Sequence, residues 1–124
     1  MTEEQIALAL RAVACKGWRW MPGMYFGEPI GSEVVMRRRV DAYKEAPPIG
    51  AIPILDDPAT LGCLLALVRE AHRDPMASAT RGKYTPDMVY VDLYHVNENG
   101  PCRGVAGFGA TEAEALVHAL ENAR

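Results

Sequence analysis

The sequence GVAGFGATEAEALVHAL, residues 104–120, has the pattern of a strand that passes through closely spaced glycines into a helix. These glycines are Gly104, Gly107 and Gly109. A loop that holds phosphate also places glycines and free backbone N–H groups before a helix. Here Thr111 and Glu114 fit a capping box, so the chain itself is expected to occupy those donors. Glu112 adds negative charge and no lysine follows, so we predict that the glycines let a helix pack close to a sheet.

Caps at three places predict three helices. Thr2 with Gln5, and Thr111 with Glu114, fit capping boxes, and Asp57 precedes a proline at the first helical position. The predicted helices span residues 3–16, 58–72 and 112–122. Their inward stripes are Ile6, Leu10, Val13 and Ala14; Leu61, Leu64, Leu65 and Val68; and Ala113, Leu116, Val117 and Leu120. Further apolar residues widen the stripe of the middle helix, so we expect it to be the most buried.

Four segments have the composition of strands. They are residues 18–26, 33–43, 88–96 and 102–110. The first two are expected to pair as a hairpin, and the last two are expected to pair through a tight turn at Asn99-Gly100. Residues 45–55 are rich in proline and predict a stiff connection, and the polar segment 73–87 predicts a mobile loop.

The resulting order is α-β-β-α-β-β-α, which predicts a single α+β domain over residues 1–124. We expect an antiparallel sheet of about four strands packed against three helices. Residues of the third strand are apolar or aromatic on both faces, which favours helices on both sides of the sheet, as in an α/β/α sandwich. Helices on one face, with Tyr90 and Tyr94 half exposed on the other, are the alternative.

Three stretches resemble the phage ABA sandwich domain family. They are LALRAVACKGWRW at residues 8–20, IPILDDPATLGCLLALVREAH at 52–72 and GFGATEAEALVHALENA at 107–123. Proteins of this family are small helix-sheet-helix proteins of phages and prophages, generally without an assigned function. The resemblance implies a phage or prophage origin, and it supplies no catalytic residues.

Composition limits the function classes. The formal net charge is −3, which argues against a surface built throughout for nucleic acid. The N-terminal residues have no pattern of a signal peptide, and the longest apolar run, residues 61–68, is too short to span a bilayer. The three cysteines form no CxxC pair, so we expect reduced thiols and a protein of the host cytoplasm that does not bind membranes.

Arginines and aromatic residues of the first hairpin form the candidate interaction surface. Its residues are Trp18, Trp20, Tyr25, Arg37 and Arg39. Arginine beside exposed aromatic rings can stack on bases or grip phosphates. Strand alternation, however, sends Arg38 to the opposite face, and charges on a strand also protect a sheet edge from unwanted pairing. We favour this structural interpretation of the arginines, with the tryptophans in the core.

Histidines and cysteines do not form a recognisable catalytic or metal site. No HxxxH, CxxC or HExxH spacing occurs. His72 and His118 lie near predicted helix C-termini, where the helix dipole favours an imidazole. Asp56 neighbours Asp57, but Asp57 is expected to cap a helix. We therefore predict no catalytic residues, no cofactor and no metal.

The leading hypothesis is a small phage or prophage accessory protein that binds a macromolecular partner, a host or phage protein. A nucleic-acid-binding protein that uses the first hairpin is the alternative. A protein that sequesters a small molecule between sheet and loop is a third hypothesis, and an enzyme is the least favoured.

Overall fold

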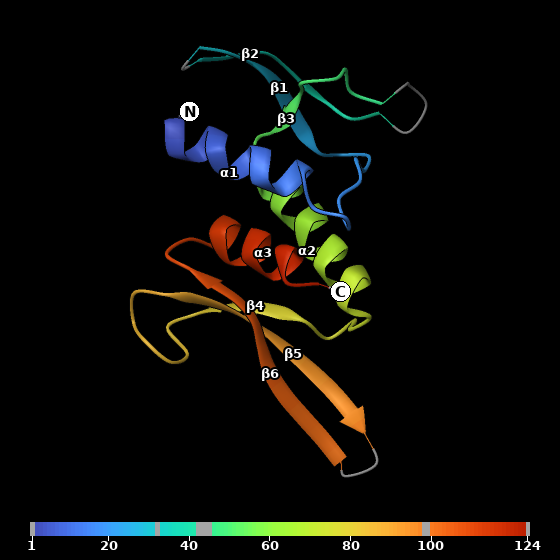
Figure 1. The fold of residues 1–124 in the computed structure, drawn as a ribbon, viewed down its shortest axis with the longest axis vertical. Coiled ribbons are helices and arrows are strands. Elements are labelled where there is room, and N and C mark those ends of the chain that lie inside the picture. Colours follow the sequence, from blue (N-terminus) through green and yellow to red (C-terminus); the bar gives the residue numbers. More distant parts are fainter. Residues whose placement is uncertain (1, 32, 42–45, 98–99, 124) are drawn as a thin grey trace.

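In the part of the chain that the structure describes, three helices lie between two small antiparallel sheets (Figure 1). The computed structural model describes residues 2–31, 33–41, 46–97 and 100–123, with the backbone alone for 95–97 and 100–103. The helices are α1 (Glu3–Val13), α2 (Pro58–His72) and α3 (Glu112–Glu121). The first sheet, in the order β2-β1-β3, contains β1 (Tyr25–Ile30), β2 (Glu33–Arg39) and β3 (Ile52–Pro53). The second sheet, in the order β4-β5-β6, contains β4 (Ser78–Arg81), β5 (Val89–Asn97) and β6 (Gly100–Gly109).

The α+β class is confirmed, but the prediction of one sheet of about four strands is wrong. Each predicted hairpin recruits a short third strand from a segment that was assigned to a connection. Ile52 and Phe26 belong to the pairing of β3 with β1, and Ser78 pairs with Asp92 across β4 and β5. The helices separate the two sheets, so the layer order is the reverse of an α/β/α sandwich (Figure 1).

The ends of several elements differ from the sequence-based prediction. The first strand starts at Tyr25 and not at Trp18, because a turn in which the Met24 amide donates to Met21 O precedes it. Helix α1 ends at Val13 and not at Lys16, since the Cys15 amide bonds back to Ala12 and tightens the chain. The predicted turn at Asn99-Gly100 includes Asn99, which lies outside the described residues.

The helix caps form at the predicted N-termini. Thr2 and Gln5 make a reciprocal capping box, and the Asp57 carboxylate accepts the Thr60 amide at 3.0 Å. At α3 the box is only half made, because Glu114 turns away from the Thr111 amide. Its carboxylate instead accepts the Ala110 amide at 3.0 Å.

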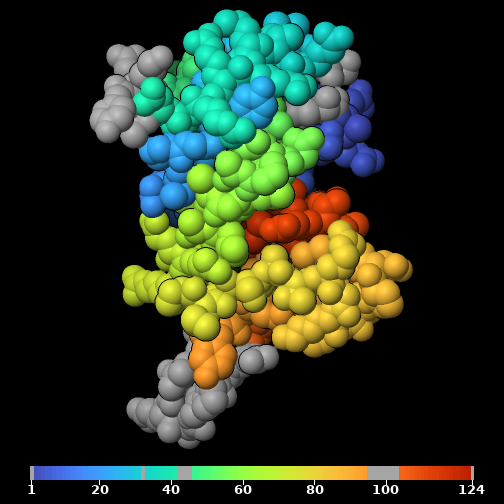
Figure 2. All heavy atoms as spheres, turned by 180° about the vertical axis from the view of Figure 1, so that it is seen from behind, coloured from blue at the N-terminus to red at the C-terminus, as the bar shows by residue number. Residues whose placement is uncertain are grey.

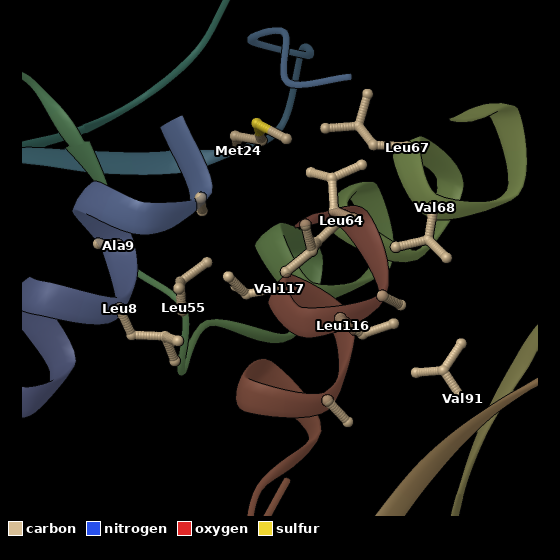
Figure 3. Packing of buried hydrophobic residues seen from close by; sticks show 14 of the residues in the cluster. Leu8, Ala9, Met24, Leu55, Leu64, Leu67, Val68, Val91, Leu116 and Val117 are labelled. Carbon is tan, nitrogen blue, oxygen red and sulfur yellow. The ribbon is translucent and has the colours of Figure 1, made fainter. Parts of the chain in front are cut away.

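Helix α3, and not α2, is the most buried helix. Half of its residues are buried: Ala115, Leu116, Val117, Ala119 and Leu120. It lies against the second sheet on one side and against α1 and α2 on the others (Figure 1). Figure 3 shows Leu116 and Val117 among side chains from α2, from α1 and from Val91 of β5.

The inward stripe of α1 also differs from the prediction. Leu8, Ala9 and Ala12 are buried, while Leu10 is 49% exposed. Small side chains let α1 approach its neighbours, so the helix turns its alanines inward and leaves one of its leucines at the surface.

Glycines of β6 bring α3 into direct contact with the strand backbone, as predicted. A Cβ on Gly107 would lie 2.7 Å from the carbonyl oxygen of Ala115 and closer still to the amide of Ala119. A Cβ on Gly109 would overlap Glu114 and lie 3.0 Å from the Ala115 amide. Both obstacles include backbone, which cannot move aside as a flexible side chain can.

Side chains of α3 and of its C-cap Asn122 bond to the free edge of the sheet between Ala106 and Ala110. Glu114 accepts from the Ala110 amide, His118 Nδ1 accepts from the Phe108 amide at 3.1 Å, and Asn122 donates to Ala106 O at 2.9 Å. The helix positions are four residues apart and the strand positions are two apart. Four helical residues advance about 6 Å and two strand residues about 6.6 Å, so the two series stay in register. Unpaired edge groups that would attract another strand are thereby satisfied.

Substitution of Gly107 by alanine tests the close contact. Because the added methyl group meets helix backbone, we expect Gly107→Ala to lower the free energy of unfolding by about 1–3 kcal/mol or more. Gly104→Ala in the same strand is the matched control, since nothing lies within 4 Å of its Cβ position. Chemical denaturation measures both variants. Equal stability of the two would contradict the proposed packing.

Candidate functional site

The structure joins the members of the predicted Trp, Tyr and Arg surface in two contacts, Trp18 with Trp20 and Arg39 with Tyr25, and leaves Arg37 unpaired within the described residues. The ring centroids of Trp18 and Trp20 are 5.2 Å apart in an edge-to-face contact, and Trp20 meets Phe26 at 5.8 Å. Both tryptophans are half-buried, and both pack against the core cluster. Each ring packs against other side chains of the chain, so the two rings do not form an exposed surface on which bases could stack.

Arg39 links β2 to the start of α2. Its guanidinium donates to both carboxylate oxygens of Asp57 at 2.8 Å, donates to Gly23 O at 3.0 Å and lies 4.9 Å above the Tyr25 ring. The bonds from Arg39, with those from Thr60, hold the pKa of Asp57 well below its usual range. Arg39 therefore ties the first sheet to a helix cap and is not available as a free phosphate ligand.

Arg37 and Arg38 are exposed on the edge strand β2 and make no ion pair within the described part of the chain. The pairing of β1 and β2 shifts register between Phe26 and Glu28, and Met36 beside this bulge has a φ of 56°. Charged residues and a bulge both discourage a second strand from adding to an edge.

Histidines and cysteines make structural contacts wherever their side chains are described. His72 Nε2 lies 2.7 Å from Ala119 O, and His118 bonds to β6. Burial raises the pKa of the Cys15 and Cys63 thiols, both of which are free. Among the described residues, no group of three His, Cys, Asp or Glu side chains is placed to hold a metal ion. The side chains of His95 and Cys102 lie outside the described residues.

The helix start that resembles a phosphate loop is already satisfied. Thr111 accepts the Glu114 amide at 3.1 Å, and Glu114 accepts the Ala110 amide. The hollow in front of this helix, of about 480 Å³, is lined by the carboxylates of Glu4, Asp56 and Glu112 among others. Negative charge at this position repels phosphate.

The outer face of the second sheet, turned away from α3, is a surface that the sequence-based analysis did not single out. Val89 and Val91 of β5 point to the helices, so Tyr90 and Asp92 point outward by strand alternation. We define the outer face by Met76, Lys83, Tyr84, Tyr90, Asp92, Val105 and Phe108. Segment 73–88 covers part of it and is seen at the surface in yellow in Figure 2.

Aromatic rings form a continuous strip that runs from the outer face, around the edge of β6, to His118 of α3. The centroids of Tyr84 and Tyr90 are 4.8 Å apart, those of Tyr90 and Phe108 are 6.2 Å apart, and those of Phe108 and His118 are 5.0 Å apart. The Tyr90 hydroxyl lies 3.1 Å from the Thr85 hydroxyl. Contacts between neighbours hold the rings in place, while Tyr84 and Phe108 remain about half exposed.

An ion pair lies next to this strip. Lys83 Nζ is 3.1 Å from Asp92 Oδ2, and the Tyr84 hydroxyl donates to Oδ1 at 3.4 Å. The Asp92 side chain is 11% exposed and that of Lys83 is 30% exposed. The alternation of Tyr90, Asp92 and Tyr94 was visible in the sequence, but the partners of Asp92 come from the segment that was predicted to be a mobile loop.

Comparison with protein families, characterised proteins and solved structures found no match for this chain. Within the described residues, no helix is long and apolar enough to cross a membrane.

The contact between Arg39 and Asp57 predicts a specific dependence of stability on pH. Because the pKa of Asp57 is lower in the folded chain, its ion pair stabilises the fold fully above the unfolded-state pKa. This contribution is lost as the pH falls from about 5 toward the folded-state pKa. We expect Arg39→Gln to lower the free energy of unfolding at neutral pH. We also expect that this free energy falls less steeply in the variant as the pH is lowered.

Arg38→Gln is the control, since Arg38 has no ion pair in the described structure. Denaturant midpoints at neutral and acidic pH report both effects. If the two variants have the same pH profile, Arg39 does not stabilise the ionised carboxylate.

Proposed function

We propose that this chain is a small phage or prophage accessory protein that binds another protein through the outer face of the second sheet. The observation that carries the proposal is the clustering of apolar side chains. Four of the eight large hydrophobic residues exposed in the described structure belong to this face: Met76, Tyr84, Val105 and Phe108. Contiguous exposed apolar surface marks interaction sites, and aromatic residues and methionine are enriched in protein interfaces.

Charge favours a protein over a nucleic acid at this face. Its lysine, Lys83, is already paired with Asp92 at 3.1 Å. The exposed Arg37 and Arg38 belong to the other sheet, at the opposite end of the molecule (Figure 1). A nucleic-acid surface needs unpaired cations beside its stacking rings, whereas Lys83, 5.4 Å from the centre of the Tyr84 ring, is paired with a carboxylate.

The edges of the sheets favour recognition by side chains. The edge of β6 next to α3 is bonded to the helix and its cap at Ala106 and Phe108, and β4 contains only four residues. Addition of a partner strand needs a long unpaired edge. A partner that packs on the face of the sheet needs only exposed side chains, which the outer face provides.

The resemblance of residues 8–20, 52–72 and 107–123 to the phage ABA sandwich domain family supports the phage or prophage origin. With it we propose the host cytoplasm as the compartment.

Affinity capture with matched variants tests the binding face. Phe108→Glu places a charge in the aromatic strip, and Ile49→Glu makes the same change at a fully exposed residue outside the outer face. From extracts of lysogenic cells, we expect Phe108→Glu to recover at least about tenfold less partner protein, and Ile49→Glu to recover it like the unchanged chain.

Tyr84→Glu serves as a second variant, because Phe108 also contacts His118 and its loss alters α3 packing. Thermal unfolding confirms that each variant is folded before capture. Recovery of the same partner by Phe108→Glu and Tyr84→Glu would contradict the proposal, and so would loss of the partner after nuclease treatment.

A second measurement addresses the nucleic-acid alternative. We expect no binding of single or double strands tighter than about 10⁻⁵ M at about 150 mM salt, because Arg39 is engaged and the net charge is −3. Fluorescence anisotropy with a labelled oligonucleotide at two salt concentrations measures this. Submicromolar, salt-sensitive binding that Arg37→Ala removes would instead establish the first hairpin as a nucleic-acid surface.

A further inference from the structure

A hollow with both polar and apolar lining lies on the outer face beside the aromatic strip. Its volume is about 710 Å³, which is ample for one or two sugar-sized rings. The polar lining is Ser78, Thr80, Lys83 and Asp92, and apolar walls include Met76 and Tyr94. The hollow therefore combines hydrogen-bonding groups with apolar walls.

The ion pair in this hollow keeps unused hydrogen-bonding capacity. Asp92 receives Lys83 on one oxygen at 3.1 Å and a long bond from Tyr84 on the other at 3.4 Å. A carboxylate has about four acceptor sites and an ammonium has three donors. Both partners can therefore bond to a further group while they remain paired.

Two hydroxyls extend the polar lining along β4. Ser78 is the cross-strand partner of Asp92, so the two side chains share a face, and Thr80 follows on the same face. Neither hydroxyl makes a hydrogen bond to another part of the chain that the structure describes. Each hydroxyl can donate as well as accept.

Charge and polarity exclude three ligand classes. An anion that approached Lys83 would lie against Asp92, and a cation at Asp92 would lie against Lys83. An apolar ligand would cover the ion pair and the two hydroxyls without replacing their bonds to water, which is unfavourable. A neutral ligand with several neighbouring hydroxyl groups meets none of these obstacles.

We infer that the hollow binds a neutral polyhydroxylated ring, a carbohydrate. Asp92 accepts a hydrogen bond from one hydroxyl, and Lys83 donates to the hydroxyl on the next carbon. The C–H face of the ring lies against Met76 and Tyr94. This site uses a different part of the outer face from Phe108 and does not depend on the protein partner.

Titration of amide NMR spectra with small probes tests the site. The probes are a set of hexoses, myo-inositol, and cyclohexanol as a ring of the same size without neighbouring hydroxyls. We expect at least one hexose to shift the amides of Ser78 and Asp92 with a dissociation constant on the order of 1 mM. Cyclohexanol and inorganic phosphate should leave them unchanged.

Lys83→Met removes the ammonium and keeps an unbranched side chain one atom shorter, and Lys16→Met is the control at an exposed lysine outside the hollow. We expect Lys83→Met to weaken hexose binding about tenfold or more, and Lys16→Met to have no effect. If Lys83→Met does not fold because Asp92 loses its partner, Lys83→Met with Asp92→Leu removes both charges and should also abolish binding.

Three results would overturn the inference: no hexose shifts these amides, cyclohexanol shifts them equally, or Lys83→Met binds as well as the unchanged chain. Phe108→Glu should still bind the hexose. If Phe108→Glu still captures the partner and binds the hexose, the proposed function alone is overturned. If Phe108→Glu loses the partner but no hexose shifts the amides of Ser78 and Asp92 in the unchanged chain, the carbohydrate site alone is overturned.

Discussion

Contact between the backbone of β6 and helix α3 is the constraint on which the rest of the structure depends. Without side chains at Gly107 and Gly109, the helix rests directly on the strand, and no Cβ fits between them. This closeness brings two polar side chains of α3, and that of its C-cap Asn122, within hydrogen-bonding distance of the strand edge. A helix held even a side chain farther away would leave those edge groups to water or to another strand. Glycine therefore serves both packing and closure of the edge.

Local signals in the sequence predicted the helices and the role of the glycines. Caps depend on residues three apart, and an amphipathic stripe depends on residues within a few turns. The two-residue β3 and four-residue β4 carry no such pattern, since their strand geometry comes from hydrogen bonds to β1 and β5. The division into two sheets is likewise non-local. The strands form two sheets because the helices pack between them. Neither the composition nor the periodicity of the sequence indicates this arrangement.

The sequence predicts only part of the candidate site, because local patterns do not show which distant segments come together. Alternation of Tyr90, Asp92 and Tyr94 predicts an outward-facing row of polar and aromatic side chains. Lys83 and Tyr84 complete it from a segment whose composition is typical of a loop. At the first hairpin, Arg39 looked available for a ligand because its partner, Asp57, lies 18 residues away and already had a role as a helix cap. One carboxylate fills both roles.

The edges of the second sheet next to β4 and α3, and its exposed outer face, together limit how this fold can bind a partner. Where β4 and α3 flank the second sheet, little backbone is left for a partner to pair with, so we expect recognition there to come from side chains on the outer face. That face is not uniformly apolar. Burial of the Asp92 carboxylate, whose partner Lys83 is 30% exposed, costs desolvation, and apolar residues of similar size often stabilise a fold as well as a buried charge pair does. An interface that needed only apolar contact would gain nothing from Lys83 and Asp92, whereas a hydroxyl-bearing ligand would use both charges without separating them.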